Sequence, residues 1–454
     1  MNRTAVPLAL PLVLLLVLPG ARPTLAAPTL LADSTYADRW TLPNGLEVVT
    51  REVPGAPDVS VSWGYRFGLD NDPADKPGLA SLLAEVGYAA AAGDIPERTR
   101  EEMESLRPGG WSLKVTRRQT LFSETAKPGQ LAGVLRQVAT RMRGVTVTDS
   151  GLKRARATVR RLMGEKYFGS VDQMLHWQVR EYARGLDKTG ILTVAAATGL
   201  DRETPPSVQQ AITRAYAPAN GVLALAGDFG GLDLHAILAS EFGDLPAGTR
   251  LPDPAPVRLD SVTRVVERPE VLEPVGVLGL AAPALADSLH PSFYLSMLVL
   301  GGQAKQVWGP ASPPLAARFQ YAVLDDPDVV RFYPKLEPGR GADPQQLTSA
   351  FEMMVGALFE LLITRDIYEE YSYNVIWLLG GPMGRSVRGA VARDPAALNL
   401  LCVSTASRAL WGTDDFWAEY RARFRPAVLR DIRMWGGWLG DPAHQARLLF
   451  VPRR

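Results

Sequence analysis

Two periodicities of apolar and polar positions occur along the first half of the chain. Asn44-Gly45 separates two extended runs, residues 40–42 and 46–50, and an Asn-Gly pair in this setting predicts a β-hairpin. Other segments alternate with the period of two typical of strands, or have apolar residues three and four positions apart, as helices do. The predicted strands are 59–65, 111–124 and 222–227, and the predicted helices are 79–91, 129–142, 152–165 and 205–216.

A proline-rich stretch separates these elements from a second, similar series. Four prolines within residues 246–262 predict a linker. The second series consists of an extended run at 271–280, a helix near 291–300, a strand at 329–332 and a helix at 344–364. Strands and helices are mixed in both halves without strict β-α-β alternation. We therefore predict two α+β domains, an N-terminal one at 28–245 and a C-terminal one at 263–454.

The first residues have the composition of an export signal. Arg3 precedes an apolar run at 5–18, and small residues follow at Ala26 and Ala27. A basic start, a short apolar core and a small-residue cleavage site are typical of a secretory signal peptide, here residues 1–27. We expect an exported protein, periplasmic in a two-membrane bacterium and otherwise secreted. An uncleaved membrane anchor is the alternative.

Composition and charge narrow the class of protein. Hydrophobic residues make up 46% of the chain and charged residues 21%, which is the balance of a globular protein. Lys and Arg number 49 against 48 Asp and Glu, so the basic excess of a nucleic-acid binder is missing and no nucleic-acid partner is expected. Cys402 is the only cysteine, which rules out an intrachain disulfide and predicts a small buried apolar side chain.

Several short motifs follow one another in the order found in one family of zinc peptidases. Residues 42–49, Leu-Pro-Asn-Gly-Leu-Glu-Val-Val, resemble the opening strand pair of the pitrilysin/insulinase family, which includes the mitochondrial processing peptidases. Residues 76–80 look like the approach to that family's zinc helix. Residues 216–220 and 242–246 are similar to the end of its N-terminal domain, and 300–302 resembles a glycine turn in its C-terminal domain. The resemblance implies the processing-peptidase-like metallohydrolase fold, in which two homologous sheet-and-helix domains form half of a clamshell.

Active members of this family carry His-x-x-Glu-His on the zinc helix and a third ligand, a glutamate, on a second helix. The two histidines lie one helical turn apart and face the metal, while the first glutamate acts as general base. Here Ser81 and Glu85 stand at the histidine positions and Ala84 at the position of the base. Leu162 stands at the third ligand position, and Ala155 replaces a further acidic residue two turns before it. The resemblance therefore implies that the family's zinc and its catalytic residues have been lost.

The remaining side chains offer no replacement for this site. No two histidines lie close enough in sequence to bind a metal from one helix, and serine-hydrolase and phosphate-loop motifs are absent. We expect no metal, no cofactor and no catalytic residue of the zinc mechanism. The four histidines are His176, His235, His290 and His444.

A non-catalytic copy of the family's fold still has a role that the resemblance implies. In several two-chain members, a catalytic subunit pairs with a homologue that lacks the zinc motif and helps to hold an extended peptide. We expect such a pairing with a homologous active zinc peptidase, or a self-dimer. The partner subunit can also supply an Arg/Tyr pair that stabilises an oxyanion, and Arg318 and Tyr321 are the candidates. Two alternatives stay open: an active zinc endopeptidase with an unrecognised or inter-chain metal site, and a purely structural scaffold.

Overall fold

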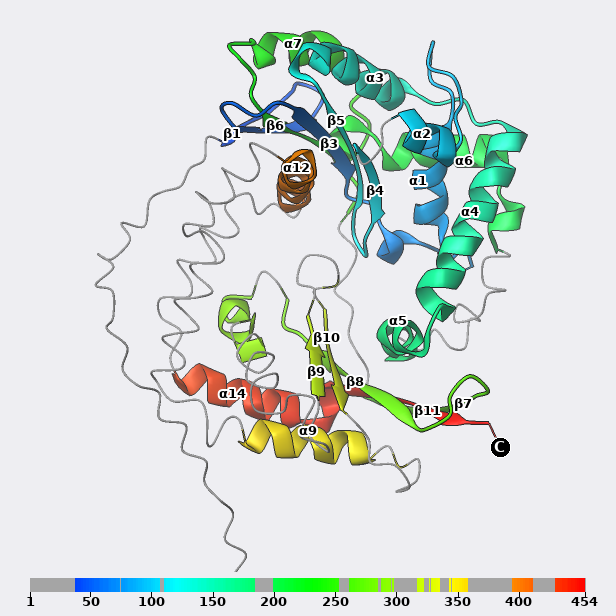
Figure 1. Ribbon diagram of the computed structural model, residues 1–454, viewed down its shortest axis with the longest axis vertical. Coiled ribbons are helices and arrows are strands. Elements are labelled where there is room, and N and C mark those ends of the chain that lie inside the picture. Colours follow the sequence, from blue (N-terminus) through cyan, green and yellow to red (C-terminus); the bar gives the residue numbers. More distant parts are fainter. Residues whose placement is uncertain are drawn as a thin grey trace, which may run out of the picture.

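Two β-sheets and their helices make up the part of the chain that the computed structural model describes (Figure 1). The predicted signal peptide at 1–27 and the glycine turn at 300–302 lie outside the described residues. The described residues are 37–73, 75–106, 110–183, 199–252, 261–284, 287–294, 296–297, 317–321, 326, 328–334, 343, 345–357, 394–410 and 429–453.

The N-terminal sheet has six strands in the order β1-β2-β6-β3-β5-β4. Asn44 and Gly45 form the turn of the predicted hairpin: Gly45 has a φ of 85°, and the Leu46 N–H donates to the Asn44 side chain at 3.1 Å. The predicted strand at 111–124 is two antiparallel strands, because residues 116–119 form a tight turn. The strands are β1 (Ala37–Thr41), β2 (Glu47–Glu52), β3 (Val59–Tyr65), β4 (Trp111–Val115), β5 (Thr120–Ala126) and β6 (Gly221–Gly227).

The C-terminal sheet repeats this arrangement with five strands in the order β7-β11-β8-β10-β9. Its first pair is parallel and the other pairs are antiparallel, as in the series β2-β6-β3-β5-β4 of the first sheet. This repetition confirms the predicted pair of α+β domains. The exact domain boundaries stay predictions, and the first strand of the C-terminal sheet starts at Val262, the last residue of the predicted linker at 246–262. The strands are β7 (Val262–Arg268), β8 (Val275–Ala281), β9 (Ala317–Gln320), β10 (Val329–Pro334) and β11 (Gln445–Pro452).

Local sequence signals start the helices. Thr148 and Thr204 cap two of them by accepting hydrogen bonds from backbone N–H groups three residues on. Within the described residues no helix is long and apolar enough to cross a membrane. The helices are α1 (Leu79–Ala89), α2 (Arg100–Leu106), α3 (Leu131–Arg143), α4 (Asp149–Phe168), α5 (Val171–Ala183), α6 (Pro205–Ala215), α7 (Leu234–Phe242), α9 (Gln345–Ala357), α12 (Pro395–Leu410) and α14 (Leu429–Gly440).

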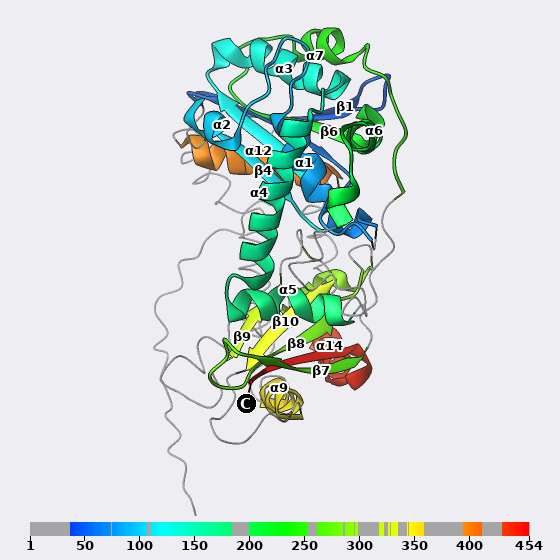
Figure 2. The same cartoon turned by 90° about the vertical axis from the view of Figure 1, so that its right-hand side faces the viewer.

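Each sheet is covered on one face by a helix that comes from the other half of the chain (Figures 1 and 2). Helix α5 packs on β8 and β11 of the C-terminal sheet, whereas α12 packs on β3, β5 and β6 of the N-terminal sheet. Ala224 and Ala226 of β6 face α12, and Leu223 and Leu225 face the opposite core. Both faces of this strand are therefore buried, which explains why it is apolar throughout.

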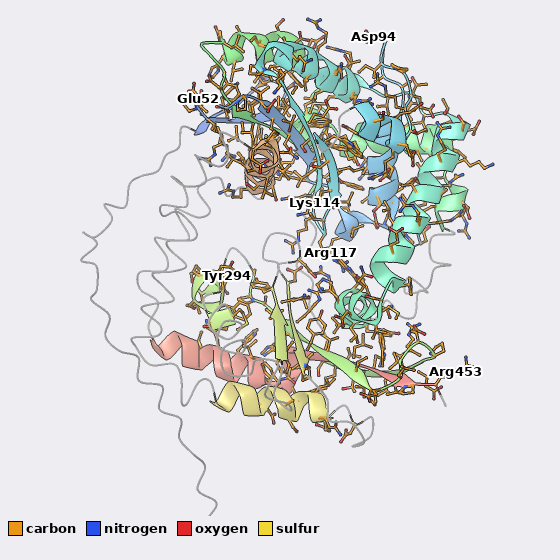
Figure 3. All side chains as sticks on the ribbon, in the orientation of Figure 1. Glu52, Asp94, Lys114, Arg117, Tyr294 and Arg453 are labelled. Carbon is orange, nitrogen blue, oxygen red and sulfur yellow. The ribbon has the colours of Figure 1, made fainter. Side chains whose placement is uncertain are left out.

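A buried network of ion pairs joins the two domains. Arg180 on α5 is fully buried and pairs with Asp326, with Asp70 at 2.9 Å and with Asp328 at 3.1 Å. Asp70 belongs to the N-terminal domain, whereas Asp326 and Asp328 precede β10. Burial alone would raise the pKa of Asp326, but Arg180 and Arg331 outweigh it and hold this pKa below its usual range. Further pairs are Arg117–Glu181, Arg118–Asp328 and Arg331–Asp326, and Figure 3 labels Arg117 where the domains meet.

Candidate functional site

Helix α1, which the sequence resemblance assigns to the family's zinc helix, has a firmly fixed start. Gly78 has a φ of 87°, which favours glycine, and it directly precedes the helix. The Asp72 carboxylate accepts hydrogen bonds from the backbone N–H groups of Gly78 and Ala80, both at 2.7 Å. The helix then packs along α4, which carries the other two aligned positions. The fold thus brings together the two segments that would share a metal.

The five aligned positions have different surroundings. Ala84 is fully buried in the N-terminal core, and Ser81 and Leu162 are half-buried. Glu85 and Ala155 are buried and line one cavity of about 260 Å³ between α1, α2 and α4. The structure therefore brings two of the five residues to one cavity, and the other three are not among the residues lining it.

A stack of charged and aromatic groups lies beside Glu85, and Arg100 is its member that lines the cavity. The Arg100 Nη2 group donates to Glu85 Oε1 at 2.5 Å, and the guanidinium lies 5.1 Å from the centre of the Trp111 ring. Trp111 stacks on Tyr88 with ring centres 5.4 Å apart, and the Tyr88 hydroxyl donates to Glu124 at 2.8 Å. The carboxylate at the second histidine position is thereby engaged by a cation within the chain.

The residues at these positions do not form a donor set for zinc. A zinc site requires three or four nitrogen, sulfur or carboxylate ligands arranged around one point. Here Ser81 and Glu85 offer one hydroxyl and one ion-paired carboxylate, and Leu162 offers nothing. In the part of the chain that the structure describes, no group of three or more His, Cys, Asp or Glu residues could hold a metal ion.

The four histidines lie on different elements and make separate contacts. His176 on α5 contacts Gln320 and Tyr333, and burial followed by the nearby Arg331 lowers its pKa to about 4. His235 Nε2 lies 2.9 Å from a carboxylate oxygen of Asp38, and the His444 ring stacks on Trp438. The fourth, His290, contacts Tyr321.

The two oxyanion candidates lie at β9. Arg318 is opposite Tyr333 in the strand register, and its side chain lies outside the described residues. The Tyr321 hydroxyl is 2.7 Å from His290 Nε2, and burial raises the pKa of Tyr321 well above its ordinary value. This tyrosine is committed to a contact within the C-terminal domain, and the role of the pair stays a prediction.

Sequence reasoning missed Arg100, which lines the cavity and pairs with Glu85, and Trp111, over which the Arg100 guanidinium lies. Arg100 starts the short helix α2, and Trp111 starts β4, the edge strand beside α1. The residues between α1 and β4 gave no periodic pattern, so nothing placed either side chain next to Glu85. The one available signal was the departure of α1 from the zinc motif, since an unmatched carboxylate on a buried helix requires a cation.

Comparison with known proteins places the fold. Models of known protein families give no match to the sequence, and neither do curated protein sequences. Solved structures do match: a protease from Helicobacter pylori superimposes with a TM-score of 0.71 at 16% identity, over 92% of this chain and 99% of that one. The chain has the fold of the insulinase-type, or M16, peptidases.

Two further solved structures match this chain over most of its length. An M16 inactive domain from Pseudomonas fluorescens superimposes with a TM-score of 0.69 at 13% identity, over 92% of this chain and 98% of that one. The periplasmic protease PqqL from Escherichia coli gives a TM-score of 0.67 at 13% identity, over 92% of this chain and 48% of that one. This chain therefore spans about half the length of PqqL and corresponds to one M16 half.

Proposed function

We propose that this chain is a non-catalytic partner subunit of an active zinc peptidase, and that it helps to form a chamber and hold an extended peptide. One observation carries the proposal: at the position that the resemblance assigns to the second zinc-binding histidine, Glu85 is ion-paired with Arg100, which lies over Trp111 at the start of β4. Ala84 at the position of the base can neither accept nor donate a proton. The site keeps a place for a peptide without a group that activates water.

The contacts of Glu85 also argue against zinc binding by this chain. Rebuilding the metal site would require breaking the Glu85–Arg100 pair and would still leave Leu162 at the third ligand position. An unpaired Arg100 guanidinium would then face the incoming cation. We therefore propose that the chain does not bind zinc, and the active endopeptidase alternative has no supporting contact among the described residues.

The match to PqqL supports the proposed partner. Since PqqL carries a match to this chain in about half of its length, a second half can be supplied within one protein. We propose that a homologous active peptidase, or a second copy of this chain, supplies it here. Residues 1–27 support export, and we propose that the pair works outside the cytoplasm.

Strand β4 is the proposed place for the peptide. It is the last strand of the N-terminal sheet and pairs with β5 on one side, so its other edge presents backbone N–H and C=O groups. An extended peptide can add to such an edge through main-chain hydrogen bonds, largely independent of its sequence. Figure 3 labels Lys114 on this strand, which faces the region between the domains.

The test is to mix the purified chain with a homologue from the same genome that carries the intact zinc motif. We expect a stable complex on size-exclusion chromatography and faster cleavage of an extended peptide by the complex than by the homologue alone. The control is a peptide of the same sequence with alternate backbone nitrogens methylated, which cannot pair with a strand edge. A complex without a change in cleavage would contradict the proposal and favour the scaffold, and no complex at all would refute the partner role.

A further inference from the structure

The cavity beside Glu85 is lined by both apolar and charged residues. Its volume of about 260 Å³ is slightly below the range of about 300–1,000 Å³ typical of sites for drug-sized ligands, so it suits one or two amino-acid residues. It lies where α1, α2 and α4 meet. The apolar lining residues are Val86, Ala89, Ala90, Met103, Val147, Ala155 and Ala157.

Several hydrogen-bond donors around this cavity lack an acceptor. A guanidinium has five N–H donors, and Arg100 donates one hydrogen bond from Nη2 to Glu85 while its buried Nε has no acceptor in the described part of the chain. The indole N–H of Trp111, beneath this guanidinium, is also buried without one. Arg98 lines the cavity, and no described residue forms an ion pair with its side chain. Unmet donors at a cavity indicate a missing acceptor, because burying them unpaired is costly.

The acidic residues of the cavity do not meet this need. Glu85 is paired with Arg100, and Glu97 is paired with Arg154 and accepts a hydrogen bond from Thr148 at 2.8 Å. Glu101 is exposed at the rim. The formal charges of the lining balance, three arginines against three glutamates, but the donors without partners belong to the arginines and to the indole.

We infer that this cavity binds a carboxylate, supplied by the C-terminus of a peptide or by an acidic side chain, with the adjoining apolar group against α1. This inference rests on the proposed peptide-holding function. Arginine binds carboxylates through two parallel N–H donors, and the apolar walls take up an aliphatic side chain next to the acid. The stack on Trp111 and the bond to Glu85 hold Arg100 in place before the ligand arrives.

The position of Trp111 gives the peptide a direction. Strand β4 starts at Trp111 and ends at Val115. A peptide that pairs with this edge and places its C-terminal carboxylate by Arg100 must end at the Trp111 end of the strand. It therefore runs antiparallel to β4, and the carboxylate site fixes the register in which the peptide is held.

Isothermal titration calorimetry with three small probes tests the inference. N-acetyl-Ala-Leu carries a terminal carboxylate, its C-terminal amide carries none, and the α-amide of N-acetylglutamate carries only a side-chain carboxylate. Loss of hydrogen bonds to a charged group predicts that the amide binds at least about tenfold more weakly than the acid. Tight binding of the terminal acid alone assigns the site to peptide C-termini, whereas equal binding of the glutamate probe assigns it to acidic side chains.

Charge variants of exposed or rim residues provide the controls. We expect Arg98→Gln to abolish the difference between acid and amide, Glu101→Gln to keep or strengthen acid binding, and Arg143→Gln on α3, paired with Asp244 away from the cavity, to change nothing. Circular dichroism confirms that each variant folds. Equal binding of acid and amide, no binding of either, or loss of acid binding in Glu101→Gln with retention in Arg98→Gln would overturn the inference.

A longer peptide separates this inference from the function on which it rests. A 12-residue peptide that is blocked at both ends and has no acidic side chain can pair with β4 but offers no carboxylate. If it binds while the small acid does not, the carboxylate site is wrong and peptide holding stands. If neither binds, both proposals fail.

Discussion

At the scale of single residues, Arg180 is a fully buried cation in a cluster of carboxylates. Its side chain has no exposed surface and faces Asp70, Asp326 and Asp328. Removing one member of a buried ion network leaves uncompensated charge, so we expect Arg180→Met to lower the free energy of unfolding by about 3–5 kcal/mol. Urea denaturation measures this change.

The matched control for Arg180 is an exposed ion pair in the same domain. Arg161 and Glu165 pair one turn apart on α4, and both side chains are more than half exposed. We expect Arg161→Gln to change the unfolding free energy by no more than about 0.5 kcal/mol. Equal effects of the two substitutions would show that the buried network contributes no more than a surface pair.

His176 gives stability a specific dependence on pH. Its pKa falls from 6.5 in an exposed setting to about 4 in the folded protein, because burial and then Arg331 oppose the charged imidazole. Between these two pH values the unfolded chain binds a proton at His176 and the folded chain does not. The titration of this residue therefore does not affect the free energy of unfolding above pH 6.5 and decreases it as the pH falls from 6.5 to about 4.

The test compares unfolding free energies of the wild type and His176→Gln between pH 8 and pH 4. We expect the difference in unfolding free energy between the two proteins to be constant above pH 6.5. On acidification the wild type should lose up to about 3 kcal/mol more than the variant. Glutamine retains hydrogen-bonding groups but cannot titrate. Parallel curves over the whole range would mean that this imidazole does not titrate differently in the folded state.

How much of the site could be predicted differs from residue to residue. The alignment of a strongly apolar helix with a known motif was enough to nominate Ser81, Ala84 and Glu85, because helical spacing fixes which side chains share a face. The cation that pairs with Glu85 could not be predicted. Arg100 reaches it through tertiary folding of the segment between α1 and β4, and tertiary contacts leave no periodic signal.

At the scale of elements, the crossed helices α5 and α12 couple the two domains. Leu398 on α12 is buried against the N-terminal sheet, whereas Leu400 on the same helix is 70% exposed. We expect Leu398→Ala to cost about 2–4 kcal/mol and Leu400→Ala to cost less than about 0.5 kcal/mol. Because each of these helices covers the sheet of the other domain, neither domain is complete alone, and we also expect one cooperative unfolding transition, followed by circular dichroism.

Two separate transitions, of which Leu398→Ala shifts only one, would contradict this coupling.

Many of the elements were predictable: the hairpin at Asn44-Gly45 and the helices α1, α3, α4 and α6 follow from turn chemistry and periodicity, whereas no bounds were predicted for α2, α5 and α7. The buried Cys402 was also predicted from its apolar segment. That its helix would cover the sheet of the other domain could not be predicted, because an apolar face does not specify which apolar surface it meets.

At the scale of the whole molecule, the repeated strand order shows one architecture used twice in a chain of half-clamshell length. The halves share no obvious sequence identity, so pattern alone could not show this repetition, and the family resemblance supplied it. Both domains retain the M16 arrangement of helices and strands, while Ser81, Glu85 and Leu162 stand at the positions that the sequence resemblance assigns to the metal ligands.

The most direct test of this account is the zinc content and peptidase activity of the purified mature chain. Elemental analysis after incubation with zinc and desalting gives the first quantity, and cleavage of a long unstructured peptide gives the second. The account predicts far less than one zinc per chain and no cleavage, with or without added metal. One zinc per chain, together with cleavage that a chelator abolishes, would contradict it and establish an active peptidase.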